Sequence, residues 1–350
     1  MKKKNSTAQL KKANFKKKFL KDSKINSLYI IFRNELYSQI KNQKFCIGVS
    51  GGPDSLALAF LSKVYSIELG NKFVALIVDH NLRKESKSEA QKIKKNLIKH
   101  KIKTKILTWK GAIPKSNIQF NARKIRYLLL NKECKKMKIN NLVLAHHKSD
   151  LIENFFIRLF RGSGLKGLSS LNIKKTFDRQ SFNLIRPLLN IDKNDLVYIS
   201  RKIFKFYIND PTNYKEKFLR TRIRNYLNKF EQDGFELNKL KLTLNNLQMA
   251  NESIDYYVEK SLKKHIRYLK NNMGLVNFSL FRHESEEVIF RNISDIISKI
   301  GGNYYPPRGK EVKNLIIKTQ NDNFKKATLG GCIIEKDHNI LIFRRERGFK

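Results

Sequence analysis

The sequence has few residues of several types, and each scarcity excludes a class of protein. Its 350 residues include 3 cysteines, 6 prolines and 1 tryptophan. Cysteines this few and this far apart form no disulfide framework and no Cys-x-x-Cys metal site, which predicts a reducing, cytoplasmic environment. No run approaches the roughly 18 apolar residues that span a bilayer, and the N-terminus is lysine-rich, so neither a membrane span nor a signal peptide is expected.

Acidic residues are also scarce relative to basic ones. The chain has 30 Asp and Glu against 73 Lys and Arg, a formal net charge of +43. Such a field favours a polyanionic partner, and nucleic acid is the commonest one. Part of the excess can instead reflect a lysine-rich composition that forms solvated surface, but the sign still favours RNA over an acidic protein.

One glycine-rich stretch organises the first half of the chain. Residues 45–49 predict a buried strand, after which come Ser50-Gly51-Gly52-Pro53-Asp54-Ser55 and then apolar residues at helical spacing. A strand, a glycine turn and a helix N-terminus together offer N–H donors to an anion. The stretch has neither the Gly-Lys-Ser/Thr of a Walker A loop nor the spacing of the dinucleotide fingerprint. We therefore predict a phosphate site of another kind, with an ordinary strand–helix turn as the alternative.

Strands and helices alternate through the region that follows. Strands are predicted at residues 45–49, 72–78, 104–108 and 141–145, and helices at 25–40, 85–100, 117–134, 148–160 and 193–204. This order predicts an α/β fold with a doubly wound, mostly parallel sheet, whose ligands bind beyond the carboxyl ends of the strands. The polar clusters of the sequence follow those strand ends, so we expect them to meet at one edge of the sheet.

The pattern divides the chain into four parts. They are a basic flexible tail (1–26), a catalytic domain (27–228), a helical linker or subdomain (229–272) and a small α+β C-terminal domain (273–350). The linker belongs to one long helical pattern over residues 232–267. The C-terminal domain ends in two apolar runs, 328–334 and 340–343, which predict a β-hairpin.

Six blocks in a fixed order carry a resemblance to a known family. They are Ser50–Ser55, Val78-Asp79-His80-Asn81-Leu82-Arg83, Ala122-Arg123-x-x-Arg126-Tyr127, Ala145-His146-His147, Arg161-Gly162-Ser163-Gly164 with Gly167-Leu168, and Arg186-Pro187-Leu188-Leu189. Over about residues 44–225 the chain resembles tRNA(Ile)-lysidine synthetase, of the N-type ATP pyrophosphatase (PP-loop) superfamily with its adenine nucleotide alpha hydrolase-like fold. The segment from Leu329 to Ile334 resembles, less specifically, that family's C-terminal tRNA-binding domain.

The resemblance implies a two-step ligase reaction. ATP adenylates the C2 oxygen of the wobble cytidine of tRNA(Ile) with a CAU anticodon, and pyrophosphate leaves. The ε-amine of free L-lysine then displaces AMP and forms lysidine, which changes the codon read from AUG to AUA. The implied ATP-binding residues are Ser50, Gly51, Gly52, Pro53, Asp54, Ser55, Asp79 and His80.

Catalytic roles follow for several side chains. Asp54 can hold Mg²⁺, which prefers oxygen ligands and bridges phosphates, although a helix N-cap is its structural alternative. Arg123 and Arg126 lie three apart on one helix face and suit the charge on the α-phosphate, unless they are solvated surface arginines. His146 follows a strand end, where its ring can donate to a phosphate or to the cytidine; a buried structural histidine is the alternative.

Two carboxylates and four arginines complete the predicted site. Asp150 and Glu153 lie three apart on a helix and can bind the lysine ammonium, one of them acting as general base. A pair favoured by the helix dipole is the alternative. The predicted tRNA-binding residues are Arg161, Arg220, Arg222 and Arg224.

The same helix departs from the family pattern. The family has x-Asp-Asp-Gln-x-Glu-Thr after the two histidines, whereas this chain has Lys148-Ser149-Asp150-Leu151-Ile152-Glu153-Asn154. The changes at Ser149, Leu151 and Asn154 leave two alternatives open: a related tRNA-modifying enzyme such as a 2-thiolase, and a non-catalytic RNA-binding relative. A homodimer is also left open.

Overall fold

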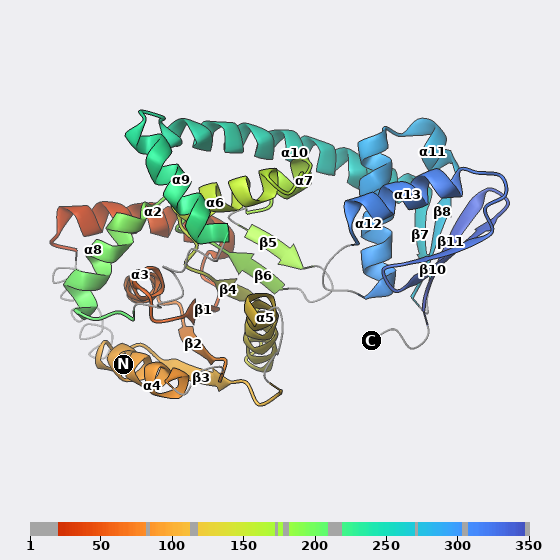
Figure 1. The fold of residues 1–350 in the computed structure, drawn as a ribbon. Helices are drawn as coiled ribbons and strands as arrows, with labels where there is room; N and C mark the ends of the chain where they lie inside the picture. Colours follow the sequence, from red (N-terminus) through yellow and green to blue (C-terminus); the bar gives the residue numbers. More distant parts are fainter. Residues whose placement is uncertain are drawn as a thin grey trace. The chain divides into compact units, whose positions relative to one another are not determined.

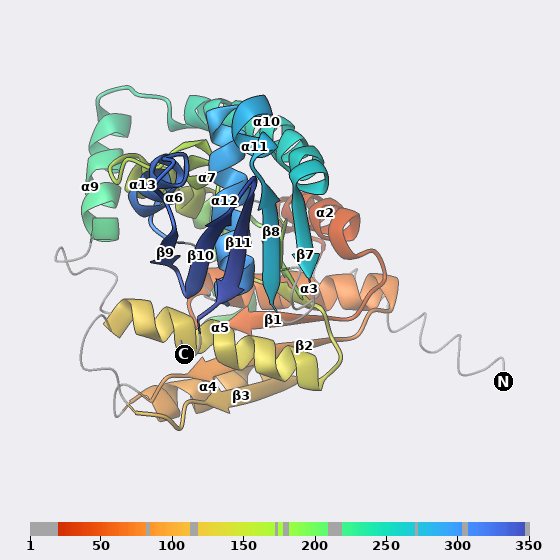
Figure 2. The same ribbon diagram turned by 90° about the vertical axis from the view of Figure 1, so that its right-hand side faces the viewer.

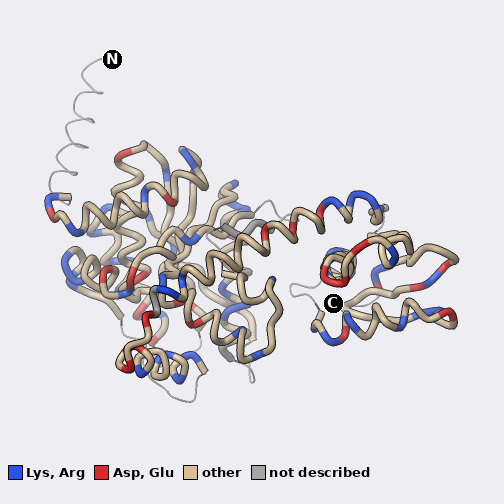
Figure 3. The backbone as a smooth tube through the Cα atoms, turned by 90° about the horizontal axis from the view of Figure 1, so that it is seen from above, with Lys and Arg blue, Asp and Glu red and all other residues tan. Residues whose placement is uncertain are grey.

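The computed structural model describes residues 20–81, 85–112, 118–171, 174–177, 182–208, 219–269, 272–302 and 307–346. The chain divides into two compact units, Met1–Lys241 and Leu242–Lys350, each with its own sheet. Figure 1 shows both units as ribbons. Lys and Arg positions are spread over the helices and strands of both units rather than gathered in one segment (Figure 3).

The first unit contains a six-stranded sheet of order β3-β2-β1-β4-β6-β5. Its strands are β1 (Phe45–Val49), β2 (Phe73–Asp79), β3 (Thr104–Thr108), β4 (Asn141–Val143), β5 (Lys174–Phe177) and β6 (Phe182–Ile185). Five strands run parallel, and β5 pairs antiparallel with β6 at one edge. The predicted doubly wound, mostly parallel α/β fold is confirmed. Strands β5 and β6 were not predicted, and β4 is shorter than the predicted strand at 141–145.

Helices cover both faces of this sheet. They are α2 (Ser23–Ile40), α3 (Pro53–Leu69), α4 (Ser86–Lys99), α5 (Ile118–Lys136), α6 (Lys148–Leu159), α7 (Leu165–Leu168), α8 (Lys193–Phe204) and α9 (Leu219–Gln232). Figures 1 and 2 show α3 and α5 on opposite faces. The predicted helices at 25–40, 85–100, 117–134, 148–160 and 193–204 match α2, α4, α5, α6 and α8 to within two residues at each end.

Side chains of the central strands alternate between two cores. Phe45, Ile47 and Val49 of β1 belong to the core beneath α2, α3, α4 and α8. Cys46 of the same strand packs into the second core, with Leu130 and Cys134 of α5. Because successive side chains of a strand point to opposite faces, a strand covered on both sides needs a continuous apolar run. This requirement explains why the runs predicted strands so clearly.

Two cysteines that are isolated in the sequence are neighbours in the fold. Cys46 and Cys134 lie far apart in sequence, yet the fold brings their thiols together in the second core, where both are buried and free. A hydrogen bond with Cys46, together with burial, raises the pKa of the Cys134 thiol. The Cys134 thiol therefore stays protonated at neutral pH.

The second unit is built on a five-stranded antiparallel sheet of order β7-β8-β11-β10-β9. Its strands are β7 (Ile266–Leu269), β8 (Met273–Asn277), β9 (Lys326–Leu329), β10 (Cys332–Asp337) and β11 (Ile340–Arg345). The helices that accompany this sheet are α11 (Ser279–His283), α12 (Glu286–Gly301) and α13 (Gly309–Thr319). The predicted hairpin is present as β10 and β11. The predicted single run 328–334 is wrong, since Gly330 and Gly331, at φ 59° and 79°, turn the chain between β9 and β10.

The long helical pattern predicted at 232–267 is present as one helix, α10 (Leu237–His265), which begins five residues later than predicted. Helix α9 ends at Gln232, and a turn that contains Gly234 at φ 87° separates the two helices. A glycine in this left-handed conformation ends a helix readily, because it has no Cβ to clash with the carbonyl. Helix α10 then continues from the first unit into the second. Within the described ranges, no helix is long and apolar enough to cross a membrane.

Candidate active site at the carboxyl ends of the strands

The glycine turn joins β1 to α3 at the middle of the sheet. The Ser55 hydroxyl lies at its centre, accepting hydrogen bonds from the backbone N–H groups of Ser50 (3.2 Å) and Gly51 (3.1 Å) and donating to the Gly52 carbonyl (2.9 Å). The order of the strands reverses between the parallel strands β1 and β4, and ligands of doubly wound folds bind at such a switch point. The turn and the N-terminus of α3, which begins at Pro53, therefore form an anion site, with Ser55 holding the turn in shape.

Gly51 has no room for a side chain. Its φ is +88°, and a Cβ there would lie 2.5 Å from Ile93 Cδ1, in the core beneath α4. We expect Gly51→Ala to lower the free energy of unfolding by about 2–4 kcal/mol through backbone strain and overpacking. Urea unfolding measures this change. Gly52→Ala is the matched control, because Gly52 has φ −69° and its nearest neighbour, Ser50 Oγ, lies 3.8 Å from the added Cβ. Equal losses in the two variants would contradict the prediction.

Asp54 stands in the first turn of α3 and faces the polar cluster. Its Oδ2 lies 3.7 Å from Nε2 of His147, while its Oδ1 is buried and has no hydrogen-bond partner among the described residues. Burial raises the pKa of Asp54, and the nearby His147 opposes that rise. A buried, unpartnered carboxylate oxygen fits a cation, which would compensate the cost of burying the charge.

The described residues contain no group of three or more His, Cys, Asp and Glu that could hold a metal ion by itself. Mg²⁺ in phosphate-transfer sites usually binds through one or two carboxylates together with phosphate oxygens and water. In this cluster the buried Oδ1 of Asp54 is the carboxylate oxygen that would suit such an ion.

His147 connects the first turns of two helices. It is 3% exposed, and its Nε2 lies 3.5 Å from Asp150 Oδ2 as well as 3.7 Å from Asp54. Its backbone N–H also donates to Asp150 Oδ2 (3.1 Å), and it forms a parallel bridge with Leu188. Sequence reasoning selected His146; the structure adds His147 as the link between the phosphate turn and Asp150.

Asp150 is held in its ionised form. Burial would raise its pKa, but its neighbours His147 and His146 and the hydrogen bond from the His147 backbone N–H outweigh burial, so the pKa of Asp150 lies below its ordinary value. Its position near the N-terminus of α6 is favourable for an anion as well. Asp150 is therefore a negative charge facing the site at neutral pH.

Glu153 is paired with arginine. Its side chain is 2% exposed, and both of its oxygens accept from Arg224 of α9, at 2.5 Å from Nε and 3.1 Å from Nη2. Arg220 approaches the same carboxylate at 3.9 Å. A lysine ammonium at Glu153 must therefore share the carboxylate with Arg224 or displace it. The predicted lysine-binding role of Glu153 stays a prediction, with this added condition.

The three predicted tRNA-binding arginines of α9 do not share one face. Arg220 and Arg224, four residues apart, point toward Glu153, whereas Arg222 is exposed on another side of the helix. Arg161, also exposed, follows the C-terminal end of α6, about 16 Å along the helix from Asp150 at 1.5 Å per residue. Arg161 and Arg222 are thus placed for a large ligand rather than for the reacting atoms.

The histidines and the arginines of α5 lie within electrostatic reach of each other. At the end of β2, Asp79 accepts from the Asn81 N–H (2.9 Å), and both ring nitrogens of His80 are buried without a hydrogen-bond partner in the described part of the chain. Burial, with the charge of Arg126, lowers the pKa of His80 to about 4. Arg123 is stacked on the Tyr127 ring, 5.2 Å from its centroid.

His146 stays neutral for a similar reason. Burial and then the charges of Arg186, Arg123 and Arg220 outweigh Asp150 and lower the pKa of His146 to about 3. A neutral imidazole carries one N–H donor and one acceptor, so His146 can bind a phosphate or a base edge without adding charge.

The neutral His146 makes stability depend on pH. Its pKa is about 3 in the folded chain and 6.5 without the fold, so the unfolded chain binds more protons between these values and stability falls as pH drops below 6.5. We expect His146→Gln to lessen the loss between pH 7.5 and pH 5 by about 2 kcal/mol, measured by urea unfolding. Exposed His338, for which His338→Gln should change nothing, is the control. A wild-type pH slope in His146→Gln would contradict the prediction.

Comparison with known proteins identifies the family. A model of the PP-loop domain matches residues 27–231. The tRNA(Ile)-lysidine synthase of Orientia tsutsugamushi (strain Boryong) is 36% identical over 320 residues, which cover 88% of this chain and 71% of the relative. That of Wolbachia pipientis wMel is 32% identical over 326 residues, covering 91% and 74%. This chain belongs to the tRNA(Ile)-lysidine synthase family. The resemblance seen in the sequence is confirmed.

A solved structure shares the PP-loop fold of this lysidine synthase family member. The U34-tRNA thiolase NcsA of Methanococcus maripaludis, solved with its [4Fe-4S] cluster, aligns with a TM-score of 0.55 and 19% identity, covering 67% of this chain and 80% of the thiolase. At this identity the likeness supports the fold alone.

Membership of the lysidine synthase family also puts the altered block in a structural context. Of the three departures, Asn154 donates from its side chain to the Ser170 hydroxyl (3.3 Å), in the segment that follows α7. The change at this position is thus accommodated by a local contact. Asp150 and Glu153, which the block retains, both belong to the polar cluster.

One residue of the cluster was missed from the sequence. Arg186 follows β6, is 4% exposed and acts on His146. Ligands bind at the carboxyl ends of parallel strands, and Arg186 was missed because no strand was predicted at β6. Nothing in the sequence distinguishes His147 from His146, because only the tertiary structure shows which ring lies against Asp54.

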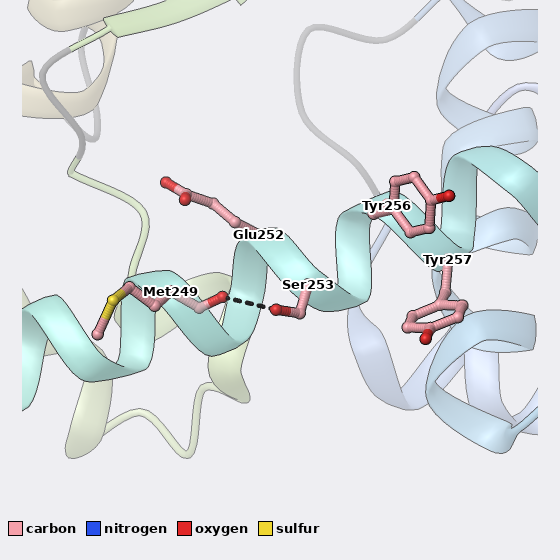
Figure 4. A pocket seen from close by; sticks show the side chains of 5 residues that line it. All are labelled: Met249, Glu252, Ser253, Tyr256 and Tyr257. Carbon is pink, nitrogen blue, oxygen red and sulfur yellow. Dashed lines mark hydrogen bonds between the residues drawn. The ribbon is translucent and has the colours of Figure 1, made fainter.

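The second unit contains a hollow of about 570 Å³ along α10, lined by Met249, Glu252, Ser253, Tyr256 and Tyr257 (Figure 4). All five come from one helix, and the Ser253 hydroxyl donates to the Met249 carbonyl (3.1 Å), so it has a partner already. No predicted site residue lines this hollow. The candidate active site is therefore defined by the polar cluster.

Proposed function

We propose that this protein is a tRNA(Ile)-lysidine synthase that joins free lysine to C2 of the wobble cytidine of tRNA(Ile) with a CAU anticodon. In the first step the cytidine O2 attacks the α-phosphorus of ATP, a P–O bond forms, and pyrophosphate leaves. In the second step the lysine ε-amine forms a C–N bond at C2, and AMP leaves with the oxygen. The product, lysidine, pairs with A rather than G.

One observation carries the proposal: at the switch point of a PP-loop sheet, Asp54 of the phosphate turn (residues 50–55) lies against His147, which also contacts Asp150. The turn and the N-terminus of α3 suit the β- and γ-phosphates. Asp54 would hold Mg²⁺, which when bound neutralises charge on the phosphate oxygens.

The arginines and neutral histidines suit the adenylation step. Arg123 and Arg126 would stabilise the charge that develops on the α-phosphate. Neutral His146, and His80 with its two unpartnered ring nitrogens, can donate to or accept from nucleotide atoms in the same region. Each residue binds or orients, so the barrier falls mainly through positioning and electrostatics.

Lysine would enter near Asp150 and Glu153. The ionised Asp150 attracts the ε-ammonium, and one of the two carboxylates takes the proton before the amine attacks. Arg220, Arg222, Arg224 and Arg161 would contact the tRNA, with Arg224 exchanging its contact with Glu153 when lysine binds. The free, buried cysteines suit a cytoplasmic location.

The test is incorporation of labelled lysine into unmodified tRNA(Ile) with a CAU anticodon, with ATP present and then omitted. The proposal expects ATP-dependent label in this tRNA and none in methionine tRNA, which has the same anticodon. Label from a sulfur donor instead of lysine would indicate 2-thiolation. Binding of tRNA without either product would indicate a non-catalytic RNA-binding relative.

A further inference from the structure

Helix α9 presents different chemistry on two sides. On one side, Ile223 and Leu227 pack against Ile152 of α6, and Arg220 and Arg224 reach Glu153. Figure 1 shows α9 crossing α6.

The other side of the helix carries a row of three residues four apart: Arg222, Tyr226 and Phe230, here called the α9 outer stripe. Residues at i, i+4 and i+8 lie one above the other on a helix. Tyr226 is 59% exposed and Phe230 39%, and Arg222 is exposed as well. Two large aromatic side chains and a guanidinium thus form one continuous exposed surface.

The aromatic surface continues past the end of the helix. The Phe235 ring packs edge-on against Phe230, with centroids 5.7 Å apart, and Phe235 is itself 64% exposed. Large exposed apolar groups in a row are unusual on a surface that contacts only water, and they indicate a binding surface.

The charge of the helix indicates the partner. Helix α9 has four basic residues, Arg220, Arg222, Arg224 and Lys229, against one acidic residue, Glu231. Aromatic rings beside arginines on a basic element are the means by which proteins bind unpaired nucleotides, since bases stack on rings and guanidinium planes. A neutral protein partner would leave the positive charge of the helix uncompensated, and an acidic one would not need the exposed aromatic rings.

We propose that the α9 outer stripe binds unpaired nucleotides of the tRNA substrate, with bases stacked on Tyr226 and Phe230 and Arg222 on a backbone phosphate. The inference rests on the proposed function, because it takes tRNA as the substrate. The opposite side of the same helix reaches the active site through Arg220 and Arg224. An RNA chain with one base held at the active site therefore lies within about one helix diameter, 10–12 Å, of the outer stripe.

The experiment measures the Kd of the full chain for unmodified tRNA(Ile). Tyr226→Ala and Phe230→Ala are each expected to weaken binding roughly tenfold, the usual effect of losing one base–aromatic stack. Tyr226→Leu and Phe230→Leu keep an apolar side chain and should weaken binding nearly as much, since stacking needs the ring. Tyr37→Ala is the matched control, because Tyr37 is 44% exposed on α2 of the same unit.

Salt dependence separates stacking from phosphate contact. Arg222→Gln should lower the slope of log Kd against log salt by about one, whereas the aromatic variants should keep the wild-type slope. Unchanged affinity in both alanine variants, or full affinity in both leucine variants, would overturn the proposal. So would an altered slope in the aromatic variants. Thermal unfolding of each variant shows whether a loss of affinity comes from misfolding. If the alanine variants misfold, the leucine variants, which keep the apolar bulk, decide the outcome.

Lysine incorporation by the wild-type protein is measured in parallel. If lysine is not incorporated but the aromatic variants still lose tRNA affinity, the proposed reaction is wrong and the RNA-binding role of the stripe stands. If lysine is incorporated while the aromatic variants bind tRNA normally, the stripe is wrong and the reaction stands.

Discussion

Asp54→Asn is expected to abolish adenylation, with a loss of about 10²–10⁴-fold in ATP-dependent pyrophosphate release, measured with tRNA(Ile) present. The buried Oδ1 of Asp54 has no partner among the described residues, and the amide keeps its shape but removes its charge. A metal ion held by Asp54 would lower the activation barrier by several kcal/mol, and each 1.36 kcal/mol is a factor of ten in rate.

The same variant should fold at least as well as the wild type. Burial raises the pKa of Asp54, which means that the ionised carboxylate costs stability at neutral pH, and Asn removes that cost. Lost activity with an unchanged or raised Tm is therefore the expected combination. Glu311→Gln, at an exposed acidic residue in the first turn of α13, is the control for removing such a charge. Activity within tenfold of wild type would place the metal elsewhere.

Arg224→Ala is expected to destabilise the fold more than Glu153→Gln. Removing Arg224 leaves the Glu153 carboxylate, 2% exposed, without its main partner, at a cost of about 3–5 kcal/mol. Glu153→Gln leaves Arg224, which is 31% exposed and can turn toward water, so we expect a loss of about 1–2 kcal/mol. Urea unfolding of both single variants and of the double variant gives the coupling energy.

The double variant should be more stable than Arg224→Ala alone, because it no longer buries an unpaired charge. Arg222→Ala, on the same helix but exposed, is the control and should change stability by less than about 0.5 kcal/mol. Equal costs for Arg224→Ala and Arg222→Ala would mean that the pair contributes nothing. In activity assays Glu153→Gln should lower lysine incorporation while adenylation continues; unchanged incorporation would remove Glu153 from the lysine site.

The local signals of the sequence determined much of the fold. Apolar runs ending at Ser50, Asp79 and His146 predicted the central parallel strands, since strands covered on both faces need continuous apolar residues. The phosphate turn could also be predicted, because the glycine pair and the polar residues that form it are adjacent in the sequence. Six such blocks in a fixed order indicated the family from the sequence alone.

Only the tertiary structure decided which side chains meet. The pairing of Glu153 with Arg224 joins residues 71 apart, and His147 rather than His146 lies against Asp54. Edge strand β5 has no long apolar run to predict it, and the turn at Gly234 delays the start of α10 beyond the residue at which the helical pattern begins. Local propensity and spacing reach only a few residues along the chain. Ion pairs, buried histidines and edge strands depend on packing between distant segments, so their partners become known only when the chain is folded.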